Sequence, residues 1–196
     1  YTKSSLATQL IIVYIMALII LGHPNYKNSF ANKTVIEELK KSDLDLEIRD
    51  LQKLYPDYNI HIQAEQEALL RHQTIVFQYP FYWYNMPAIL KHWFDEVFAY
   101  QFAYGSEGDK LKGKNFVPSF TVGSSESSYS VLGSQHFRVY EFCKNLEQTA
   151  LFAHMNYVDP IYFHGTSLAA GYTETDIKNN AKQHATKLIK HLAELG

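Results

Sequence analysis

The chain has 196 residues and a net charge of −2, and this length is enough for one domain with a full hydrophobic core. Hydrophobic residues make up 46%, which excludes a disordered chain, and the dispersed basic residues exclude a basic patch for a nucleic acid. The single cysteine, Cys143, excludes an internal disulfide and is compatible with a cytoplasmic protein.

Residues 1–15 are interpreted as an N-terminal extension or upstream sequence, and residues 16–196 as one domain. The apolar run over residues 10–21 is shorter than the ~20 residues of a membrane-spanning helix. It also lacks the small-residue cleavage site of a signal peptide. A native segment that packs on a neighbour is the alternative for residues 1–15.

Hydrophobic periodicity predicts strands and helices that alternate along the chain. The predicted strands cover residues 17–21, 46–49, 74–78, 116–122 and 157–163, and the predicted helices cover 29–41, 63–72, 88–98, 137–155 and 173–195. Pro118 is awkward inside a strand, and Pro160 marks an irregularity or an edge. The alternation predicts a three-layer α/β sandwich with a parallel sheet and helices on both faces.

Five such strands fit the flavodoxin-like order 2-1-3-4-5, in which ligands bind where the strand order reverses. The loops after the first, third and fourth strands are expected to converge there. They cover residues 23–29, 80–86 and 123–128.

The first of these loops leads into a helix N-terminus, where free N–H groups and the helix dipole favour an anion. Ser29 and the N–H of Phe30 are candidate phosphate ligands, with His23 beside them. An ordinary turn with a capping serine is an equally good interpretation. The chain has no Gly-x-Gly-x-x-Gly fingerprint and no Walker motif, so a nucleotide triphosphatase is not supported.

The loop after the third strand carries four consecutive aromatic residues between Pro80 and Pro87. Pro80 is expected to stop the strand and Pro87 to lie in the first turn of the next helix. Aromatic side chains are costly to leave in water, so a flat apolar ligand is predicted to cover them, although any one of them can also fill the core. They are Phe81, Tyr82, Trp83 and Tyr84.

The loop after the fourth strand begins with small residues that let a ligand approach the backbone closely. These residues are Thr121, Val122, Gly123 and Ser124. Tyr129 and His136 follow and are candidates for supplying a proton or stabilising negative charge. A surface histidine is the alternative for His136. No histidine and carboxylate spacing gives a convincing metal site.

Several motifs together resemble a known family. They are Gly22-His23-Pro24 with Ser29-Phe30, Ala64-Glu65-Gln66-Glu67, the block from Gln78 to Tyr84, Pro87-Ala88-Ile89-Leu90-Lys91, and Trp93-Phe94-Asp95. Over residues 16–195 the chain resembles the flavodoxin-like-fold NAD(P)H:quinone oxidoreductases. This family includes DT-diaphorase, the bacterial drug-activity modulators and the ancillary oxidoreductases of glutathione-gated potassium efflux systems.

The resemblance implies a non-covalent FMN or FAD, NAD(P)H as the electron donor, and a homodimer. It also implies two-electron ping-pong hydride transfer through the flavin N5 to a quinone. The implied site residues are His23, Ser29 and Phe30 for the flavin phosphate, Pro80, Phe81, Tyr82, Trp83 and Tyr84 for the isoalloxazine ring, and Thr121, Val122, Gly123 and Ser124 for its pyrimidine edge. The implied substrate pocket consists of Trp83, Tyr84, Tyr104 and Tyr129, and Tyr129 also supports charge on the flavin.

The chain departs from the family pattern at three places. The usual Thr-Thr-Gly-Gly is replaced from Thr121 onward, and the histidine that pairs with the tyrosine falls on Gln135, one residue before His136. The segment after Tyr104 is short, which favours FMN over FAD. Three alternatives remain open: a one-electron flavodoxin-type carrier, a regulatory partner of a membrane potassium transporter, and a fold without a cofactor.

Overall fold

The computed structural model describes residues 17–195, so the predicted extension over residues 1–15 lies outside the described residues. The strands are β1 (Ala17–Leu21), β2 (Leu46–Asp50), β3 (Thr74–Pro80), β4 (Asn115–Thr121), β5 (Asn156–Tyr157) and β6 (Ile161–Phe163). The α-helices are α1 (Phe30–Lys41), α2 (Leu51–Leu54), α3 (Ile62–Arg71), α4 (Ala88–Val97), α5 (Lys144–Phe152) and α6 (Glu174–Leu195). Short 3₁₀ helices are η1 (Tyr26–Asn28), η2 (Glu126–Ser128), η3 (Val139–Cys143) and η4 (Leu168–Ala170).

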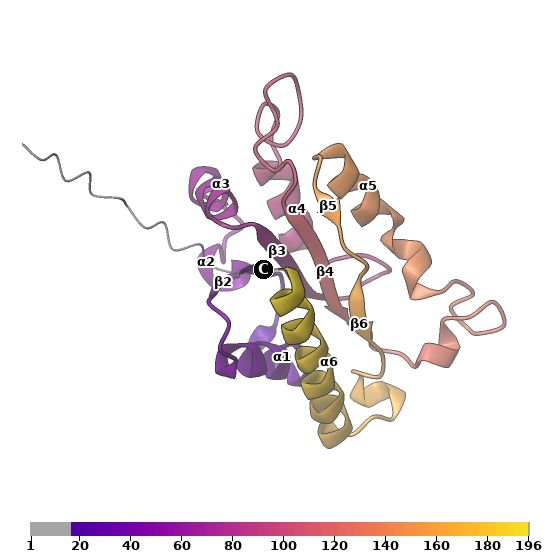
Figure 1. Cartoon of the computed structure of the whole chain (residues 1–196). Coiled ribbons are helices and arrows are strands. Elements are labelled where there is room, and N and C mark those ends of the chain that lie inside the picture. The colour runs from indigo at the N-terminus through magenta and orange to yellow at the C-terminus, as the bar shows by residue number, and fades with distance from the viewer. Residues whose placement is uncertain (1–16, 196) are drawn as a thin grey trace, which may run out of the picture.

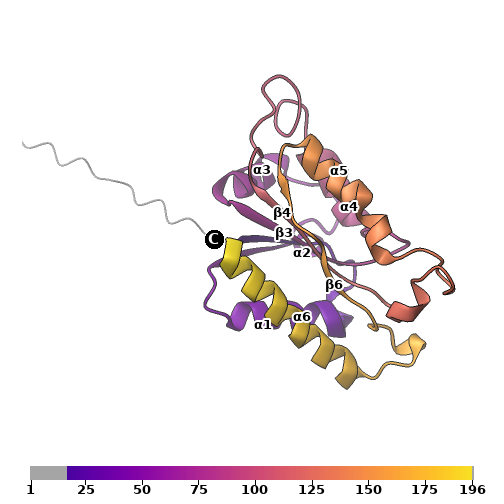
Figure 2. The ribbon, with the colours of Figure 1, turned by 45° about the vertical axis from the view of Figure 1, so that its right-hand side comes forward.

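The strands form one parallel sheet in the order β2-β1-β3-β4-β5, which confirms the predicted flavodoxin-like topology. Helices α1 and α6 cover one face, and α3, α4 and α5 cover the other (Figures 1 and 2). Each face has its own apolar core. Because both faces are covered, β1, β3 and β4 are buried along their whole length, as near-continuous apolar strands of a parallel sheet should be.

Strand β3 is longer than predicted, because it continues to Pro80 itself instead of ending at Gln78. Pro80 is in register with Thr121, and the N–H of Phe81 donates to the Thr121 carbonyl at 2.8 Å. The proline therefore ends the strand without leaving an N–H unpaired. Pro87 is the N-cap of α4, one position before the first turn in which it was expected.

The predicted fifth strand is split into β5 and β6, and both pieces pair with β4. The interruption covers residues 158–160 and includes Pro160. It lies opposite Val117 and Pro118, the β4 residues that neither β5 nor β6 pairs with. Proline has no N–H to donate to the hydrogen-bond ladder between strands. Pro118 and Pro160 therefore lie in the same interruption of the pairing with β4. The separate strand β6 then turns the chain toward the carboxyl ends of β3 and β4.

The long helix predicted over residues 137–155 is wrong, since the structure has η3 followed by the shorter helix α5. The backbone N–H of Arg138 donates to the Glu141 carboxylate at 2.8 Å, which caps the start of η3. At the other end, His154 has a φ of 57°. This left-handed conformation ends a helix, so the helix stops at Phe152.

The last helix, α6, begins with a capping box. Thr173 Oγ1 accepts the N–H of Asp176 at 3.1 Å, and the Asp176 carboxylate accepts the N–H of Thr173 at 3.1 Å. Within residues 17–195, no helix combines the length and the apolar character that crossing a membrane requires.

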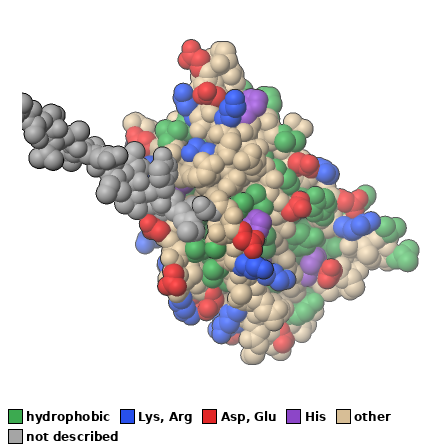
Figure 3. Space-filling view, viewed as in Figure 1, with side chains coloured by type: hydrophobic (Ala, Val, Ile, Leu, Met, Phe, Trp, Pro, Cys, Tyr) green, Lys and Arg blue, Asp and Glu red, His purple; other side chains and the backbone are tan. Residues whose placement is uncertain are grey.

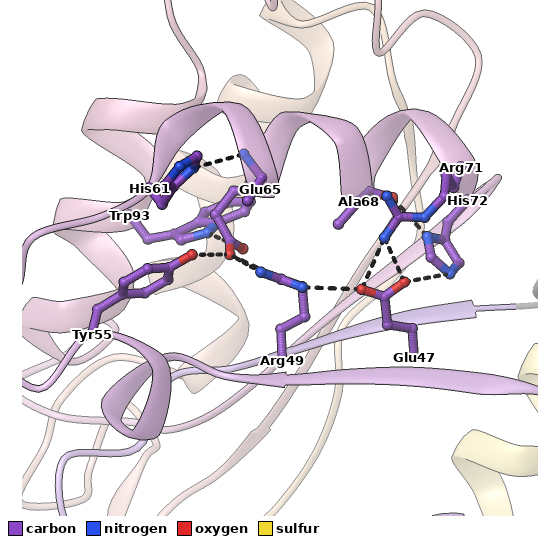
Figure 4. Close-up of polar contacts among 10 residues, drawn as sticks. Glu47, Arg49, Tyr55, His61, Glu65, Ala68, Arg71, His72 and Trp93 are labelled. Carbon is purple, nitrogen blue, oxygen red and sulfur yellow. Dashed lines mark hydrogen bonds and ion pairs between the residues drawn. The ribbon is translucent and has the colours of Figure 1, made fainter.

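A buried carboxylate joins α3 to β2, to α4 and to the loop after α2 (Figure 4). Glu65 is 0% exposed and accepts hydrogen bonds from Arg49 Nε at 2.8 Å, Trp93 Nε1 at 2.9 Å and the Tyr55 hydroxyl. Arg49 also contacts Glu47 at 3.1 Å. A buried charge is tolerated only when it is paired and hydrogen-bonded, so these contacts fix how α4 packs on the sheet.

Candidate functional site

The carboxyl ends of β1, β3 and β4 surround a cavity of about 590 Å³, which is within the usual range for small-molecule sites. The predicted site residues that line it are His23, Ser29, Phe30, Pro80, Phe81, Tyr82, Thr121 and Gly123. The structure therefore brings the three predicted loops together at the position expected from the strand order. The rest of the wall comes from the first loop and the start of α1, with Asn25, Asn28, Ala31 and Asn32, and from residues 166–169, which follow β6.

The N-terminus of α1 forms one end of the cavity. Ser29 is its N-cap, and its hydroxyl accepts the N–H of Asn32 at 3.0 Å. The N–H groups of the next residues, Phe30 and Ala31, have no partner inside the helix and line the cavity with their residues. Gly22, which precedes this loop, lets α4 pack closely on the end of β1, because a Cβ there would lie 2.6 Å from the Leu90 Cβ of α4.

His23 lines the same end of the cavity as a neutral imidazole. Its Nδ1 accepts the N–H of Asn25 at 3.0 Å, so the ring hydrogen resides on Nε2. Burial lowers the pKa of His23 to about 4. The side chain therefore offers one N–H donor without a charge at neutral pH.

We expect the pKa of His23 to make stability depend on pH. Between its ordinary pKa of 6.5 and the folded value of about 4, the unfolded state binds a proton that the folded state does not. The free energy of unfolding should therefore fall as pH falls through this window, by up to about 1.4 kcal/mol per pH unit. Urea unfolding between pH 7 and 5 measures this slope.

His23→Asn is the matched variant, because an amide oxygen can replace Nδ1 as the acceptor for Asn25. Its slope should be shallower than that of the unmodified protein. His184, whose pKa burial also lowers to about 4, still contributes a slope of the same sign. Identical slopes for the variant and the unmodified protein would contradict the assignment to His23.

The aromatic loop forms a two-residue hairpin beside the cavity, which Tyr82 lines and Trp83 and Tyr84 do not. Tyr82 and Asn85 exchange backbone hydrogen bonds of 2.8 and 2.9 Å, and the central residues Trp83 and Tyr84 have φ values of 47° and 64°. Positive φ at both positions is typical of a type I′ turn, which prefers Asn and Gly. Trp83 is 92% exposed. An aromatic residue held in a strained, exposed turn indicates a functional constraint.

Tyr84 is anchored more firmly than Trp83. Its hydroxyl donates to Gln135 Oε1 at 2.9 Å, and its ring stacks on Phe142 with 5.1 Å between centroids. Within residues 17–195, no protein carbonyl accepts the backbone N–H of Trp83 or Tyr84. These two N–H groups are therefore available to a ligand at the hairpin.

The loop after β4 is held by the chain that follows β6. The N–H of Gly165 donates to the Ser124 carbonyl at 3.1 Å, and the N–H of Ser167 donates to the Gly123 carbonyl at 3.2 Å. Val122 is buried, whereas Gly123 reaches the cavity. The residues after β6 thus form part of the site, although only the polar stretch Thr166-Ser167 signals this in the sequence.

Tyr129 is half-buried against Phe81, with 6.3 Å between ring centroids. Burial raises its pKa, and Tyr84 adds to the shift. Among the described histidines, His164 has its ring beside Tyr129, at 5.5 Å between centroids, whereas His136 is exposed and has a φ of 63°. His164 follows β6, so its distance from Tyr129 along the chain hides the pairing from sequence analysis.

His164 has a defined tautomer. Its Nδ1–H donates to the Ser124 carbonyl at 3.2 Å, so Nε2 is left as a proton acceptor. Burial lowers the pKa of His164. The Tyr129 and His164 pair therefore combines a neutral phenol with a neutral imidazole beside the aromatic wall of the cavity.

Tyr104 lies apart from this cavity. It lines a second cavity of about 450 Å³ between α4 and α5, together with Met86 and Phe152. Leu151 and Phe152 of α5 are exposed, as are Val131, Leu132, Phe137 and Tyr140 in the segment before it, and apolar side chains are scattered among charged ones on the right-hand side of Figure 3.

The site meets the chemical requirements of a flavin mononucleotide. The α1 N-terminus, the Ser29 cap and the Nε2–H of His23 provide donors for a phosphate. Phe81 and the hairpin provide an aromatic wall and free N–H groups for a polar ring edge. The residues present therefore fit the expected cofactor.

The flavodoxin-like fold family matches residues 16–188 of the chain. The chain is 42% identical to the glutathione-regulated potassium-efflux system ancillary protein KefF of Enterobacter sp., over 89% of this chain and 96% of that protein. It is 36% identical to the uncharacterized NAD(P)H oxidoreductase YrkL of Bacillus subtilis, over 85% and 93%. The solved general stress protein 14 of Treponema denticola, in complex with FMN, superposes with a TM-score of 0.82 at 30% identity, over 92% and 99%.

Proposed function

Since the chain belongs to the flavodoxin-like fold family, we propose that it is an FMN-dependent NAD(P)H oxidoreductase that reduces quinone-like acceptors. The observation that carries the proposal is the cavity at the carboxyl ends of β1, β3 and β4, which the N-terminus of α1 and the first residue of the aromatic hairpin, Tyr82, both line. The FMN complex of the Treponema denticola relative and the NAD(P)H oxidoreductase name of YrkL support it.

FMN, when bound, supplies the redox chemistry, in which a hydride is taken from NAD(P)H and two electrons are passed to an acceptor in a separate half-reaction. The protein binds and orients the reactants. His23, Ser29 and Phe30 would hold the phosphate, and Phe81 with the hairpin N–H groups would hold the ring. Trp83 and Tyr84 form the wall against which nicotinamide and acceptor are placed in turn.

Tyr129 and His164 are the residues we propose for proton handling. The Tyr129 hydroxyl donates a hydrogen bond toward developing negative charge, and His164 Nε2 accepts a proton beside it. The sequence makes His136 a candidate for the second role, whereas the contact between the Tyr129 and His164 rings, at 5.5 Å between centroids, favours His164. Proton donors placed at developing charge are a common source of catalysis.

The absorption spectrum of the purified protein after incubation with FMN tests the proposal. A retained flavin band near ~450 nm that NADH or NADPH bleaches without oxygen, and that a quinone restores, is the expected result. A protein that retains no flavin would overturn the cofactor assignment. A flavin that is retained but not bleached would overturn the NAD(P)H oxidoreductase assignment.

Replacing Trp83 by asparagine should separate stability from activity. Asparagine accepts a positive φ more readily than tryptophan, and Trp83 is almost fully exposed. We expect the free energy of unfolding to stay unchanged or rise by up to about 1 kcal/mol, while the KM for nicotinamide or acceptor rises about tenfold. Urea unfolding and steady-state kinetics measure the two effects.

The control for this variant is Tyr100→Asn, which also replaces an exposed aromatic residue but lies outside the hairpin. Its KM values should match those of the unmodified protein. If Trp83→Asn leaves both KM values unchanged, the hairpin tip does not contact the substrates.

We also propose a homodimer through the face that carries α5 and the second cavity. Leu151 and Phe152 are both more than half exposed there, and Phe152 lines the second cavity with Met86 and Tyr104; exposed apolar surface of this kind marks interfaces. Phe152→Asp is expected to convert the dimer to a monomer in analytical ultracentrifugation. Leu54→Asp, at the opposite edge of the sheet, should leave the dimer intact; a monomeric unmodified protein contradicts the proposal.

A second candidate function is regulation of a membrane potassium transporter, which can coexist with the enzyme activity. The 42% identity to the potassium-efflux ancillary protein KefF favours it. A tagged copy should co-purify with a glutathione-gated potassium antiporter from solubilised membranes. Recovery no greater than that of an unrelated flavoprotein would exclude this function.

A further inference from the structure

A chain of buried polar side chains leads from α6 to the wall of the cavity. His184 Nε2 lies 2.8 Å from Ser119 Oγ, and the Ser119 hydroxyl donates to Gln78 Oε1 at 2.6 Å. Gln78 Nε2 donates to Asn32 Oδ1 at 2.8 Å, and Asn32 Nδ2 donates to Thr121 Oγ1 at 3.0 Å. All five residues are buried, and the chain crosses α6, β4, β3 and α1.

Each residue in this chain donates a hydrogen bond to the next one, from His184 toward Thr121. A serine hydroxyl has a single hydrogen, and Ser119 uses it toward Gln78, so Ser119 accepts from His184. At the far end, Thr121 accepts from Asn32 and keeps its own hydroxyl hydrogen for the cavity that it lines.

The direction depends on His184. If its Nε2 had no hydrogen, Ser119 would have to donate to His184, and both amide side chains would turn over to keep their partners. Thr121 would then donate to Asn32 and present only lone pairs to the cavity. Burial, with Lys187 adding to it, lowers the pKa of His184 to about 4, so the ring is neutral at pH 7 and carries one hydrogen.

We infer that His184, Ser119, Gln78 and Asn32 are positioning residues that hold the Thr121 hydroxyl as a hydrogen-bond donor to the ligand in the cavity. For FMN as that ligand the inference rests on the proposed function. The site then favours a ligand with a hydrogen-bond acceptor atom opposite Thr121. An acceptor there can bind the Thr121 hydroxyl hydrogen, whereas a ligand donor at the same position would be left without a partner.

A double-mutant cycle tests this, with FMN dissociation constants measured by fluorescence quenching. Thr121→Val removes the hydroxyl with little change of shape, and Ser119→Ala cuts the chain. Each should weaken FMN binding about five- to tenfold. With Val at position 121, Ser119→Ala should change the dissociation constant by less than about twofold. Equal effects of Ser119→Ala in both backgrounds would overturn the inference.

A second pair of variants tests the donor at the start of the chain. His184→Gln keeps an N–H donor and should bind FMN within about twofold of the unmodified protein. His184→Leu removes the donor and should weaken binding as much as Ser119→Ala does. Equal losses for both variants would show that His184 acts through packing alone and would overturn the inference.

The imidazole tautomer provides a readout without FMN. In ¹⁵N–¹H correlation spectra of the unmodified, ligand-free protein, the His184 hydrogen should be on Nε2. A hydrogen on Nδ1 would overturn the inference even if FMN binds. An unmodified protein that has the Nε2 hydrogen but binds no FMN overturns the proposed function and, with it, the inference for FMN.

Discussion

Glu65→Ala is expected to lower the free energy of unfolding by about 3–5 kcal/mol. The substitution removes the buried acceptor that the Trp93 indole N–H, the Tyr55 hydroxyl and the Arg49 guanidinium share, and Arg49 keeps only its contact with Glu47. Removing one partner of a buried ion pair costs more than the pair itself contributes, because the remaining charge stays desolvated. Urea unfolding at pH 7 measures the loss.

Two matched variants separate the buried cluster from ordinary helix effects. Glu67→Ala, on the same helix, removes an exposed carboxylate that only accepts from Gln63 Nε2 at 2.9 Å, so its effect should stay within about 0.5 kcal/mol. Glu65→Gln keeps the acceptor oxygen but not the charge and should fall between the two. A loss below about 1 kcal/mol for Glu65→Ala would show that the cluster does not stabilise the fold.

Ser29→Asp is expected to weaken FMN binding at least about 100-fold without unfolding the protein. Aspartate is as good an N-cap as serine, so it can accept the Asn32 N–H that Ser29 accepts now. It also places a negative charge where the phosphate should bind. Repulsion between two charges about 4 Å apart near a protein surface amounts to about 4 kcal/mol, more than the roughly 2.7 kcal/mol that 100-fold requires.

Riboflavin, which has no phosphate, is the control ligand for this prediction. Its dissociation constant should change by less than about threefold between the unmodified protein and Ser29→Asp. Ser29→Asn, a neutral cap of similar size, should bind FMN nearly as well as the unmodified protein. Equal weakening of FMN and riboflavin by Ser29→Asp would contradict a phosphate at the α1 N-terminus.

Much of the scaffold was predictable because local signals and burial agree there. The bounds of β1 match the prediction, and the capping role that is one interpretation of Ser29 is present at the start of α1. The prediction of one helix over residues 137–155 is wrong because the local signal there is ambiguous. Apolar spacing is similar in 3₁₀ and α-helical turns over one or two turns, so periodicity cannot show where η3 gives way to α5.

The candidate site was only partly predictable. Its three loops follow strands, and the strand order brings such loops together, so most of the cavity wall could be named from the chain alone. The part contributed after β6 could not, because that position depends on how Pro118 and Pro160 divide the fifth strand. The pairing of Tyr129 with His164 instead of His136 follows from the same division.

The amino-acid sequence determines the fold class, the parallel order of the strands and the aromatic loop, since these follow from hydrophobic periodicity and from proline and capping residues that act over a few neighbours. Only the tertiary structure decides which buried polar groups meet. Asn32 and Thr121 are 89 residues apart along the chain, and Ser119 and His184 are 65 apart. Such contacts arise from the packing of α1 and α6 on one face of the sheet, and no local pattern encodes them.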